Sequence, residues 1–296
     1  MDLFSQNTIK ELMRDAGITF RRDYGQNFLT SRTITERIAD DCSDTEDCMI
    51  FEIGPGIGTL TKELAMRYRK VVAVEIDSGI IPVLGRTLSE FENVKIINAD
   101  IMKTDIRKLI EDESQGLKVY VCANLPYYIT TPILMSLLEC GVPFEAITVM
   151  VQSEVASRLC AAPGTAEYGA ITAVLGYYGS VSRLFTVPAG CFIPMPKVNS
   201  AVVRIDLFRD RDVKPKDEKL FFATVRAAFE MRRKTLSNAL YSAFPQLGKQ
   251  GATDAITACG FRADIRGERL STSDFIALSD RIYERLRYCQ ADNVRR

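Results

Sequence analysis

Residues 51–61, FEIGPGIGTLT, determine the fold of this chain. An apolar run leads into a glycine-rich turn, and a helical pattern follows from Thr59 onward. The glycines are Gly54, Gly56 and Gly58. Glycine lets the backbone turn tightly and approach a ligand closely, and doubly wound α/β folds bind ligands at such a junction. The dinucleotide-binding fingerprint, G-x-G-x-x-G, has its third glycine one residue later than this sequence does, so the spacing disfavours a dinucleotide as the ligand. A structural turn that binds no ligand is another interpretation of this stretch.

Short apolar runs typical of buried strands recur along the chain. They lie at 49–53, 71–76, 94–98, 119–123, 146–151, 183–187 and 201–207. Helical patterns separate the first five, and no clear helix separates the last two. This order predicts an α/β fold with a doubly wound, Rossmann-like sheet of seven strands, mainly parallel, whose last strands form an antiparallel hairpin. Thr33 and Glu36 predict a capping box at one helix start, and Thr131-Pro132 an N-cap with proline at the first helical position.

The end of the chain reads differently. Residues 208–219 are polar with a proline, and only helical patterns follow, at 220–230, 234–243, 252–259 and 272–288. We therefore expect a first domain at 1–207, which includes a polar N-terminal segment at 1–30, then a linker at 208–219 and a small helical domain at 220–296. From Phe208 onward 18 Lys and Arg face 12 Asp and Glu, a net charge of +6 in a chain of zero net charge. This excess is compatible with a phosphate-backbone partner, although charge clusters are often only solvated faces.

Composition narrows the chemistry. The chain has no histidine and no tryptophan, so no imidazole can act as a base or metal ligand, and base stacking would use Tyr or Phe. Its eight cysteines include no C-x-x-C pair, which predicts neither a zinc site nor a disulfide framework. No apolar run is long enough to span a bilayer, so no membrane association and a reducing cytoplasm are expected.

Two carboxylates at strand ends extend the predicted ligand site. Glu75 ends the run after the glycine turn, where a carboxylate can accept hydrogen bonds from both ribose hydroxyls. Asp100 ends the next run and could accept from an adenine amino group, although an aspartate there could also simply cap a turn. Polar groups at consecutive strand ends favour a nucleoside, and an acidic domain suits a cationic sulfonium. The predicted cofactor is S-adenosylmethionine.

The fourth run ends in Asn124-Leu125-Pro126-Tyr127. An exocyclic adenine nitrogen is a poor nucleophile because its lone pair is delocalised into the ring. The side-chain oxygen of Asn124 and a backbone carbonyl near Leu125–Pro126 could hold its two N–H groups, with Pro126 fixing the backbone. Tyr127 would stack on the ring and stabilise developing positive charge. The alternative is a turn with a buried tyrosine.

A second aromatic residue, Phe192, lies in a proline-rich stretch before the last run. Phe192 could cover the other face of a flipped base, or it could be a core phenylalanine at a loop.

Six segments together resemble the ribosomal RNA adenine dimethyltransferases, and most closely the bacterial small-subunit enzymes of that family. They are QNFL at 26–29, EIGPGIGTLT at 52–61, VEID at 74–77, NAD at 98–100, NLPYY at 124–128 and FIPMPKVNS at 192–200. The resemblance covers nearly the whole chain. It implies a class I methyltransferase fold and dimethylation of two adjacent adenines in a hairpin loop near the 3′ end of 16S rRNA, in the immature 30S subunit, with S-adenosylhomocysteine as product.

The resemblance also implies roles for individual residues. Cofactor contacts would come from Gln26, Asn27, Leu29, Gly54, Gly56, Glu75, Asp100 and Asn124. The helical domain would dock on the ribosomal particle through cations such as Arg232, Arg233 and Lys234. A monomer without a metal is expected.

Three alternatives stay open. A 23S rRNA methyltransferase of the macrolide-resistance type shares the cofactor motifs and the N-x-P-Y turn. A DNA adenine methyltransferase uses a similar turn, but no target-recognition domain of obvious size is present. An assembly factor would bind the subunit without needing the reaction.

Overall fold

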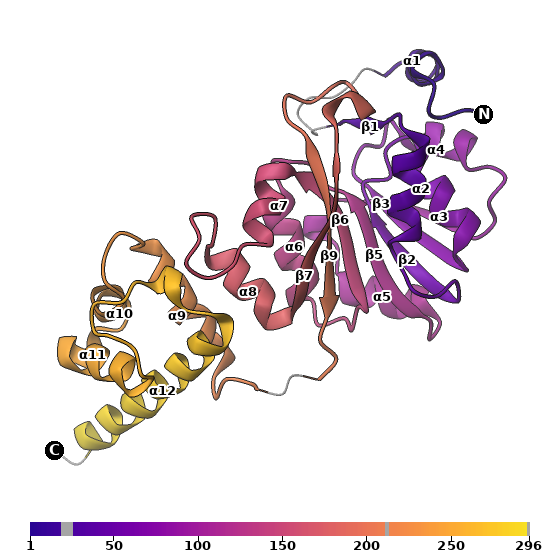
Figure 1. Ribbon diagram of the computed structural model, residues 1–296. Coiled ribbons are helices and arrows are strands. Elements are labelled where there is room, and N and C mark those ends of the chain that lie inside the picture. Colours follow the sequence, from indigo (N-terminus) through magenta and orange to yellow (C-terminus); the bar gives the residue numbers. More distant parts are fainter. Residues whose placement is uncertain (19–25, 211–212, 295–296) are drawn as a thin grey trace. The chain divides into compact units, whose positions relative to one another are not determined.

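The computed structural model describes residues 1–18, 26–210 and 213–294 of the 296-residue chain (Figure 1). It divides into two compact units. One contains Met1–Ala156 and Ser180–Arg209, the other Ser157–Gly179 and Asp210–Arg296. This division differs from the expected limits, 1–207 and 220–296, because residues 157–179 group with the C-terminal helices rather than with the sheet.

A seven-stranded sheet forms the first unit, in the order β4-β3-β2-β5-β6-β9-β7. Its strands are β2 (Cys48–Ile53), β3 (Lys70–Glu75), β4 (Val94–Asn98), β5 (Lys118–Asn124), β6 (Ala146–Gln152), β7 (Gly179–Val187) and β9 (Ser200–Leu207). Strands β2 to β6 pair in parallel, whereas β9 runs antiparallel to β6 and separates it from β7. All seven predicted strands are confirmed, and so is the α/β fold with antiparallel pairing at its end.

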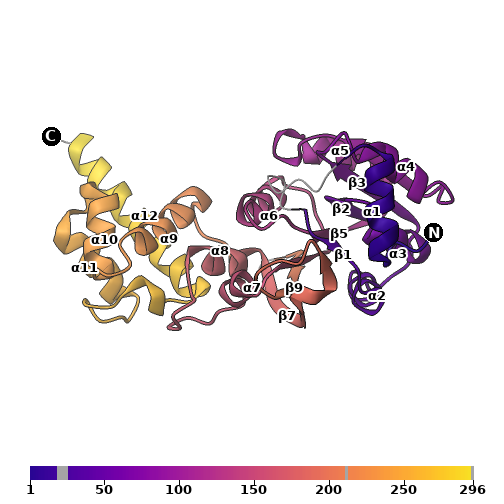
Figure 2. The ribbon, with the colours of Figure 1, turned by 90° about the horizontal axis from the view of Figure 1, so that it is seen from above.

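Helices cover both faces of this sheet, and the central strands are therefore apolar on both sides. Helices α2 (Arg32–Asp40) and α3 (Thr59–Arg67) lie on one face, and α5 (Ile106–Ser114) and α6 (Thr130–Glu139) on the other (Figure 2). The shorter elements of this unit are α4 (Ile81–Thr87), η2 (Ile101–Lys103) and η3 (Ala189–Cys191), and α7 (Ser153–Leu159) leads out of it.

Two predicted helix starts need correction. Helix α2 has Ser31 as its N-cap, so Thr33 and Glu36 lie inside the helix and form no capping box. Helix α6 begins at Thr130, which puts Pro132 at its third residue. Proline is still tolerated there, because the first-turn N–H groups have no partner within the helix.

The N-terminal segment, expected to be merely polar, contains a helix and a strand. Helix α1 (Gln6–Asp15) is capped by Ser5 and buries Ile9, Leu12 and Met13 on one side. These side chains share a hydrophobic cluster with Phe28. Strand β1 (Phe28–Leu29) pairs antiparallel with β8 (Phe192–Ile193).

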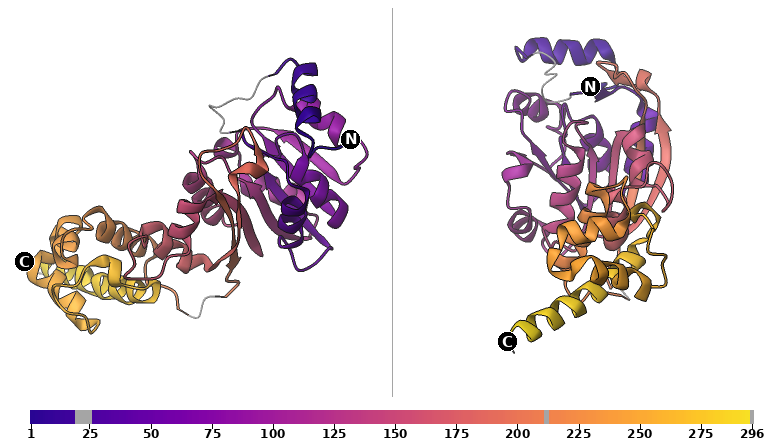
Figure 3. Two further views of the ribbon diagram at one scale, coloured as in Figure 1. Left: turned by 45° about the horizontal axis from the view of Figure 1, so that its top comes forward. Right: turned by 90° about the vertical axis from the view of Figure 1, so that its left-hand side faces the viewer.

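The second unit is helical. It contains α8 (Ala170–Tyr178), α9 (Glu218–Glu230), α10 (Leu236–Ala243), η4 (Pro245–Leu247), α11 (Gly248–Ala258), η5 (Gly267–Arg269) and α12 (Thr272–Val294) (Figure 3). The four predicted C-terminal helices are confirmed, whereas α7 and α8 were not predicted. Phe221 and Phe275 are fully buried in this unit, and the ring of Tyr177 in α8 lies 4.8 Å from that of Phe221. Within the described part of the chain, no helix is long and apolar enough to cross a membrane.

Candidate cofactor and active site

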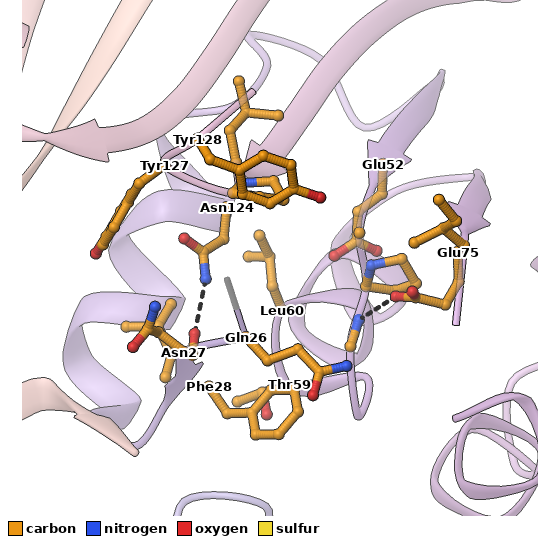
Figure 4. Close-up of a pocket in the computed structure, with 17 residues that line it drawn as sticks. Gln26, Asn27, Phe28, Glu52, Thr59, Leu60, Glu75, Asn124, Tyr127 and Tyr128 are labelled. Carbon is orange, nitrogen blue, oxygen red and sulfur yellow. Dashed lines mark hydrogen bonds between the residues drawn. The ribbon is translucent and has the colours of Figure 1, made fainter. Parts of the chain in front are cut away.

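One pocket gathers most of the predicted site residues at the carboxyl ends of β2, β3 and β5. Four of its walls are the stretch 26–29, the glycine turn after β2, Glu75 after β3, and the turn 124–128 after β5 (Figure 4). Parallel strands bring their carboxyl ends to the same edge of a sheet, which is why residues so distant in sequence meet here. Gln26, Asn27, Leu29, Gly54, Gly56, Glu75 and Asn124 all line this pocket.

The glycine turn requires its glycines. Gly54, Gly56 and Gly58 have φ of +69°, +57° and +88°, in the left-handed region that side chains avoid. A Cβ on Gly56 would lie 2.8 Å from Cε1 of Phe28. The turn therefore leaves no room for a side chain between the loop and the N-terminal wall of the pocket.

Glu75 is held by the backbone on both of its oxygens. The Gly56 N–H donates to Oε2 at 3.1 Å and the Asp77 N–H donates to Oε1 at 2.8 Å. The side chain is 5% exposed. Burial raises the pKa of Glu75, and the two backbone N–H groups oppose that rise by stabilising the charged form. Glu75 is thus oriented at the pocket with its charge supported.

A second carboxyl group, that of Glu52, also lines the pocket and was not predicted as a site residue. It is 1% exposed, and its Oε2 has no hydrogen-bond partner among the described residues. Burial, followed by the nearby charge of Glu75, raises the pKa of Glu52 to about 8, against an opposing effect of the Thr61 hydroxyl. Its place before the glycine turn was the only signal in the sequence.

Asn124 joins two walls of the pocket. Its Nδ2 donates to the backbone carbonyl of Asn27 at 3.0 Å (Figure 4). With the nitrogen used in this way, the side-chain oxygen is the group that Asn124 can offer to an amino donor.

The turn after Asn124 determines which backbone carbonyl is available to accept a hydrogen bond from a ligand beside the Asn124 side chain. The carbonyl of Pro126 accepts from the Ile129 N–H at 3.2 Å and from the Thr130 hydroxyl at 3.1 Å. The carbonyl of Leu125 accepts no hydrogen bond from the described residues, whereas the Leu125 N–H is fixed to the Met150 carbonyl at 3.2 Å. Leu125 therefore supplies the available backbone acceptor.

Tyr127 is anchored by its hydroxyl group. That oxygen lies 2.8 Å from Oγ of Ser200, the fully buried first residue of β9. Burial raises the pKa of Tyr127, and the bond to Ser200 acts in the opposite direction. Ser200 was not predicted, because nothing in its local sequence shows that it meets Tyr127. Tyr128 is a second aromatic residue at the same pocket.

Two predicted site residues lie outside the pocket lining. Asp100 caps η2 by accepting from the Met102 N–H at 3.0 Å, and it lies 3.5 Å from Lys103. Its contact with adenine stays a prediction. Phe192 is 2% exposed and packs in a hydrophobic cluster with Leu29, its partner in the β1–β8 pair. Strand pairing draws this ring into the core, and its stacking on a base stays a prediction.

The predicted RNA-binding cations differ in their surroundings. Arg232 donates to Glu268 at 2.9 Å and to the Ala166 carbonyl at 2.6 Å, both within its own unit. All three side chains are exposed. Among the side chains that the structure describes, no group of His, Cys, Asp and Glu could hold a metal ion.

A glycine turn at the end of β2, a backbone-supported carboxylate on β3 and an Asn-Leu-Pro-Tyr turn on β5 define a nucleoside-cofactor methyltransferase site. The family model for ribosomal RNA adenine dimethylase matches residues 17–276. The chain belongs to this family.

Individual relatives agree. The chain is 45% identical to "Ribosomal RNA small subunit methyltransferase A" of Lachnoclostridium phytofermentans, over 95% of this chain and 98% of the relative, and 41% identical to the protein of that name in Bacillus licheniformis, over 96% and 98%. A dimethyladenosine transferase from Plasmodium falciparum has a similar fold, with a TM-score of 0.74 at 22% identity over 87% of this chain and 98% of that one. The 23S rRNA methyltransferase ErmE gives 0.66 at 25% identity over 87% and 100%.

Proposed function

We propose that this chain transfers methyl groups from S-adenosylmethionine to N6 of two adjacent adenines in a 3′-terminal hairpin loop of 16S rRNA, during small-subunit biogenesis. The observation that carries the proposal is the turn from Asn124 to Tyr127, which faces the same pocket as the glycine loop and Glu75. Relatives 41% to 45% identical that bear the small-subunit name support this choice of ribosomal RNA.

The pocket residues fit the cofactor. Glu75 would accept from the ribose hydroxyls, the glycine turn would let the backbone approach, and Asn27 and Leu29 would close the N-terminal side. Three buried oxygens meet no hydrogen-bond partner among the described residues, namely the hydroxyls of Thr59 and Thr61 and Oε2 of Glu52, and they mark a polar site that a ligand can complete. When bound, the cofactor supplies an electrophilic methyl group and leaves as S-adenosylhomocysteine.

The chain itself would prepare the adenine nitrogen. The side-chain oxygen of Asn124 and the carbonyl of Leu125 would accept its two N–H bonds, which favours a pyramidal nitrogen whose lone pair points away from the ring. Tyr127 would stack on the base and stabilise the positive charge that develops on it. The product nitrogen is acidic enough to lose its proton to water, so a chain without histidine can run the reaction.

Target access would follow from the RNA. Adenines in a hairpin loop are unpaired, so turning them out costs less than the few kcal/mol required in a duplex. Arg233 and Lys234 in the helical unit are exposed cations suited to contact phosphates. We further propose that the protein acts as a monomer in the cytoplasm. The seven cysteines that the structure describes form no disulfide, which is consistent with a reducing environment.

The test is methyl transfer from labelled S-adenosylmethionine to purified 30S particles that lack these modifications, with 50S particles and naked DNA alongside, followed by nucleoside analysis. Dimethyladenosine in the 30S sample alone is the expected result. Label in 50S RNA would instead assign the 23S activity that the similarity to ErmE makes the second candidate. Binding to 30S without any label would favour an assembly factor.

A further inference from the structure

Glu52 occupies a position that the core would otherwise fill with an apolar side chain. Cys48 and Ile50, on the same side of β2, are fully buried in the hydrophobic cluster beneath α3. Glu52 pairs in register with Ala73 on β3 and Cys122 on β5. A carboxylate in this setting is costly unless hydrogen bonds or an opposite charge support it.

Support for Glu52 is weak in the described part of the chain, because the effect of the Thr61 hydroxyl is smaller than that of burial and no cation lies beside the carboxyl group. Its Oε2 meets no hydrogen-bond partner in the part of the chain that the structure describes, while Glu75 beside it accepts two backbone N–H bonds. The ionisable groups beside it are Glu75 on β3 and the thiol of Cys122 on β5, and Asp77 and Cys42 lie next to these two groups in turn. None of these is a cation, and among the described residues no lysine or arginine lines the pocket. Of two neighbouring carboxyl groups, the one without supporting donors holds the proton.

The order of strands places Glu52 between the two ends of the proposed reaction. Strand β2 lies between β3, which carries Glu75, and β5, which carries Asn124, and Figure 4 shows the Glu52 side chain between those two residues. If Glu75 holds the ribose and Asn124 the methyl acceptor, the part of the cofactor between them is its sulfonium and the ammonium-bearing chain attached to it. Both groups are positively charged.

Resting on the proposed function, we propose that Glu52 is a binding residue for the positive end of the cofactor, protonated in the free protein and ionised in the complex. Cofactor uptake is then coupled to release of one proton. The O–H bond of the carboxyl group breaks, its electron pair stays on the carboxylate, and the proton passes to the buffer, with nothing oxidised or reduced. The arriving cation supplies the opposite charge that the free site lacks.

Proton release can be measured without interference in this chain. With no histidine, no side chain of ordinary pKa titrates between pH 5.5 and 7. Calorimetric titration with S-adenosylmethionine at pH 6.5, in buffers of different ionisation enthalpy, gives the number of protons released. We expect about one per cofactor for the unaltered protein, because a group with a pKa of about 8 is almost fully protonated at that pH. Affinity should rise about tenfold from pH 6 to pH 7.

Protein variants and cofactor analogues identify which carboxyl group releases the proton and which positive charge of the cofactor causes the release. Glu52→Gln should release no proton and bind with an affinity independent of pH over this range, whereas Glu75→Gln should bind more weakly and still release the proton. Release with S-adenosylhomocysteine as well would assign the ammonium as the partner of Glu52, and release with S-adenosylmethionine alone would assign the sulfonium. Methylthioadenosine carries neither charge and should release none.

Three outcomes would overturn the proposal: tight binding of S-adenosylmethionine without proton release, equal release with methylthioadenosine, or unchanged release from Glu52→Gln. The first two use the unaltered protein and stand even if Glu52→Gln does not fold. Failure of S-adenosylmethionine to bind at all would instead overturn the proposed function.

Discussion

Replacing Glu52 by glutamine should make the ligand-free protein more stable at alkaline pH. The carboxyl group has a pKa of about 8 in the folded chain and an ordinary value of 4.5 when unfolded. Between these values the folded state binds more protons, so the free energy of unfolding falls as pH rises from about 4.5 to about 8. At ~1.4 kcal/mol per pH unit the full span corresponds to about 5 kcal/mol, an upper limit because local relaxation and water entry lower the cost of a buried charge.

Glutamine has nearly the same shape and does not titrate, and its amide can donate to the unpartnered threonine hydroxyls nearby. Denaturant unfolding of both proteins at pH 5.5 and 8.5 isolates this group, because all other ionisations cancel in the difference. We expect the stability of Glu52→Gln relative to the unaltered chain to increase by up to about 3 kcal/mol between the two pH values. Glu75→Gln, at a carboxylate held by two backbone N–H groups, should show a smaller change. A difference for Glu52→Gln that is the same at both pH values would refute a protonated Glu52.

Three further predictions concern the turn, the loop and the helical unit. Tyr127→Phe and Ser200→Ala each remove the 2.8 Å hydrogen bond that anchors the ring. Because such a bond contributes about 1 kcal/mol, each variant should lower the single-turnover rate about fivefold without changing cofactor affinity. A double variant that is no slower than the single variants would confirm that the two residues act together. Gly56→Ala adds a methyl group 2.8 Å from Phe28 at a φ of +57° and should weaken cofactor binding, measured by calorimetry, at least tenfold. The control Gly190→Ala, whose added methyl group meets no atom within 4 Å, should bind the cofactor normally. Equal cofactor affinities of the two variants would contradict the tight turn. The double variant Arg233→Glu, Lys234→Glu should weaken binding to 30S particles and reduce the salt dependence of that binding. Arg232→Glu should in addition lower the melting temperature, because it breaks the ion pair with Glu268. If the double variant bound 30S particles normally, the docking surface would lie elsewhere.

Apolar runs bounded by turns predicted every strand of the large sheet, because a buried parallel strand needs unbroken apolar sequence. Helix α8 was missed for a related reason. Its sequence, AITAVLGYY, is apolar nearly all round and shows no helical period. Helix α1 did carry a signal, since Ser5 is a good N-cap and Ile9, Leu12 and Met13 have helical spacing.

Site residues at strand ends were predictable to the same extent as the strands themselves. Asn124 and Glu75 reach the pocket because parallel strands share a carboxyl edge. The burial of Phe192 was not predictable, since it depends on a pairing with β1 that local sequence does not reveal, and its role beside a base stays a prediction. Glu52 was overlooked for a similar reason, because its lack of partners is a property of the folded surroundings.

The pairing of β1 with β8 also has a consequence for synthesis. Phe28 and Leu29 form one wall of the pocket, and their backbone partners are Ile193 and Phe192. A nascent chain that has not yet emerged past β8 therefore has the glycine turn, Glu75 and the bond from Asn124 to Asn27, but lacks the strand that pairs with this wall. Contacts between segments so far apart in sequence also form late in folding. Cofactor affinity should accordingly reach its full value only late in the protein's own translation, when the first strand has found its distant partner.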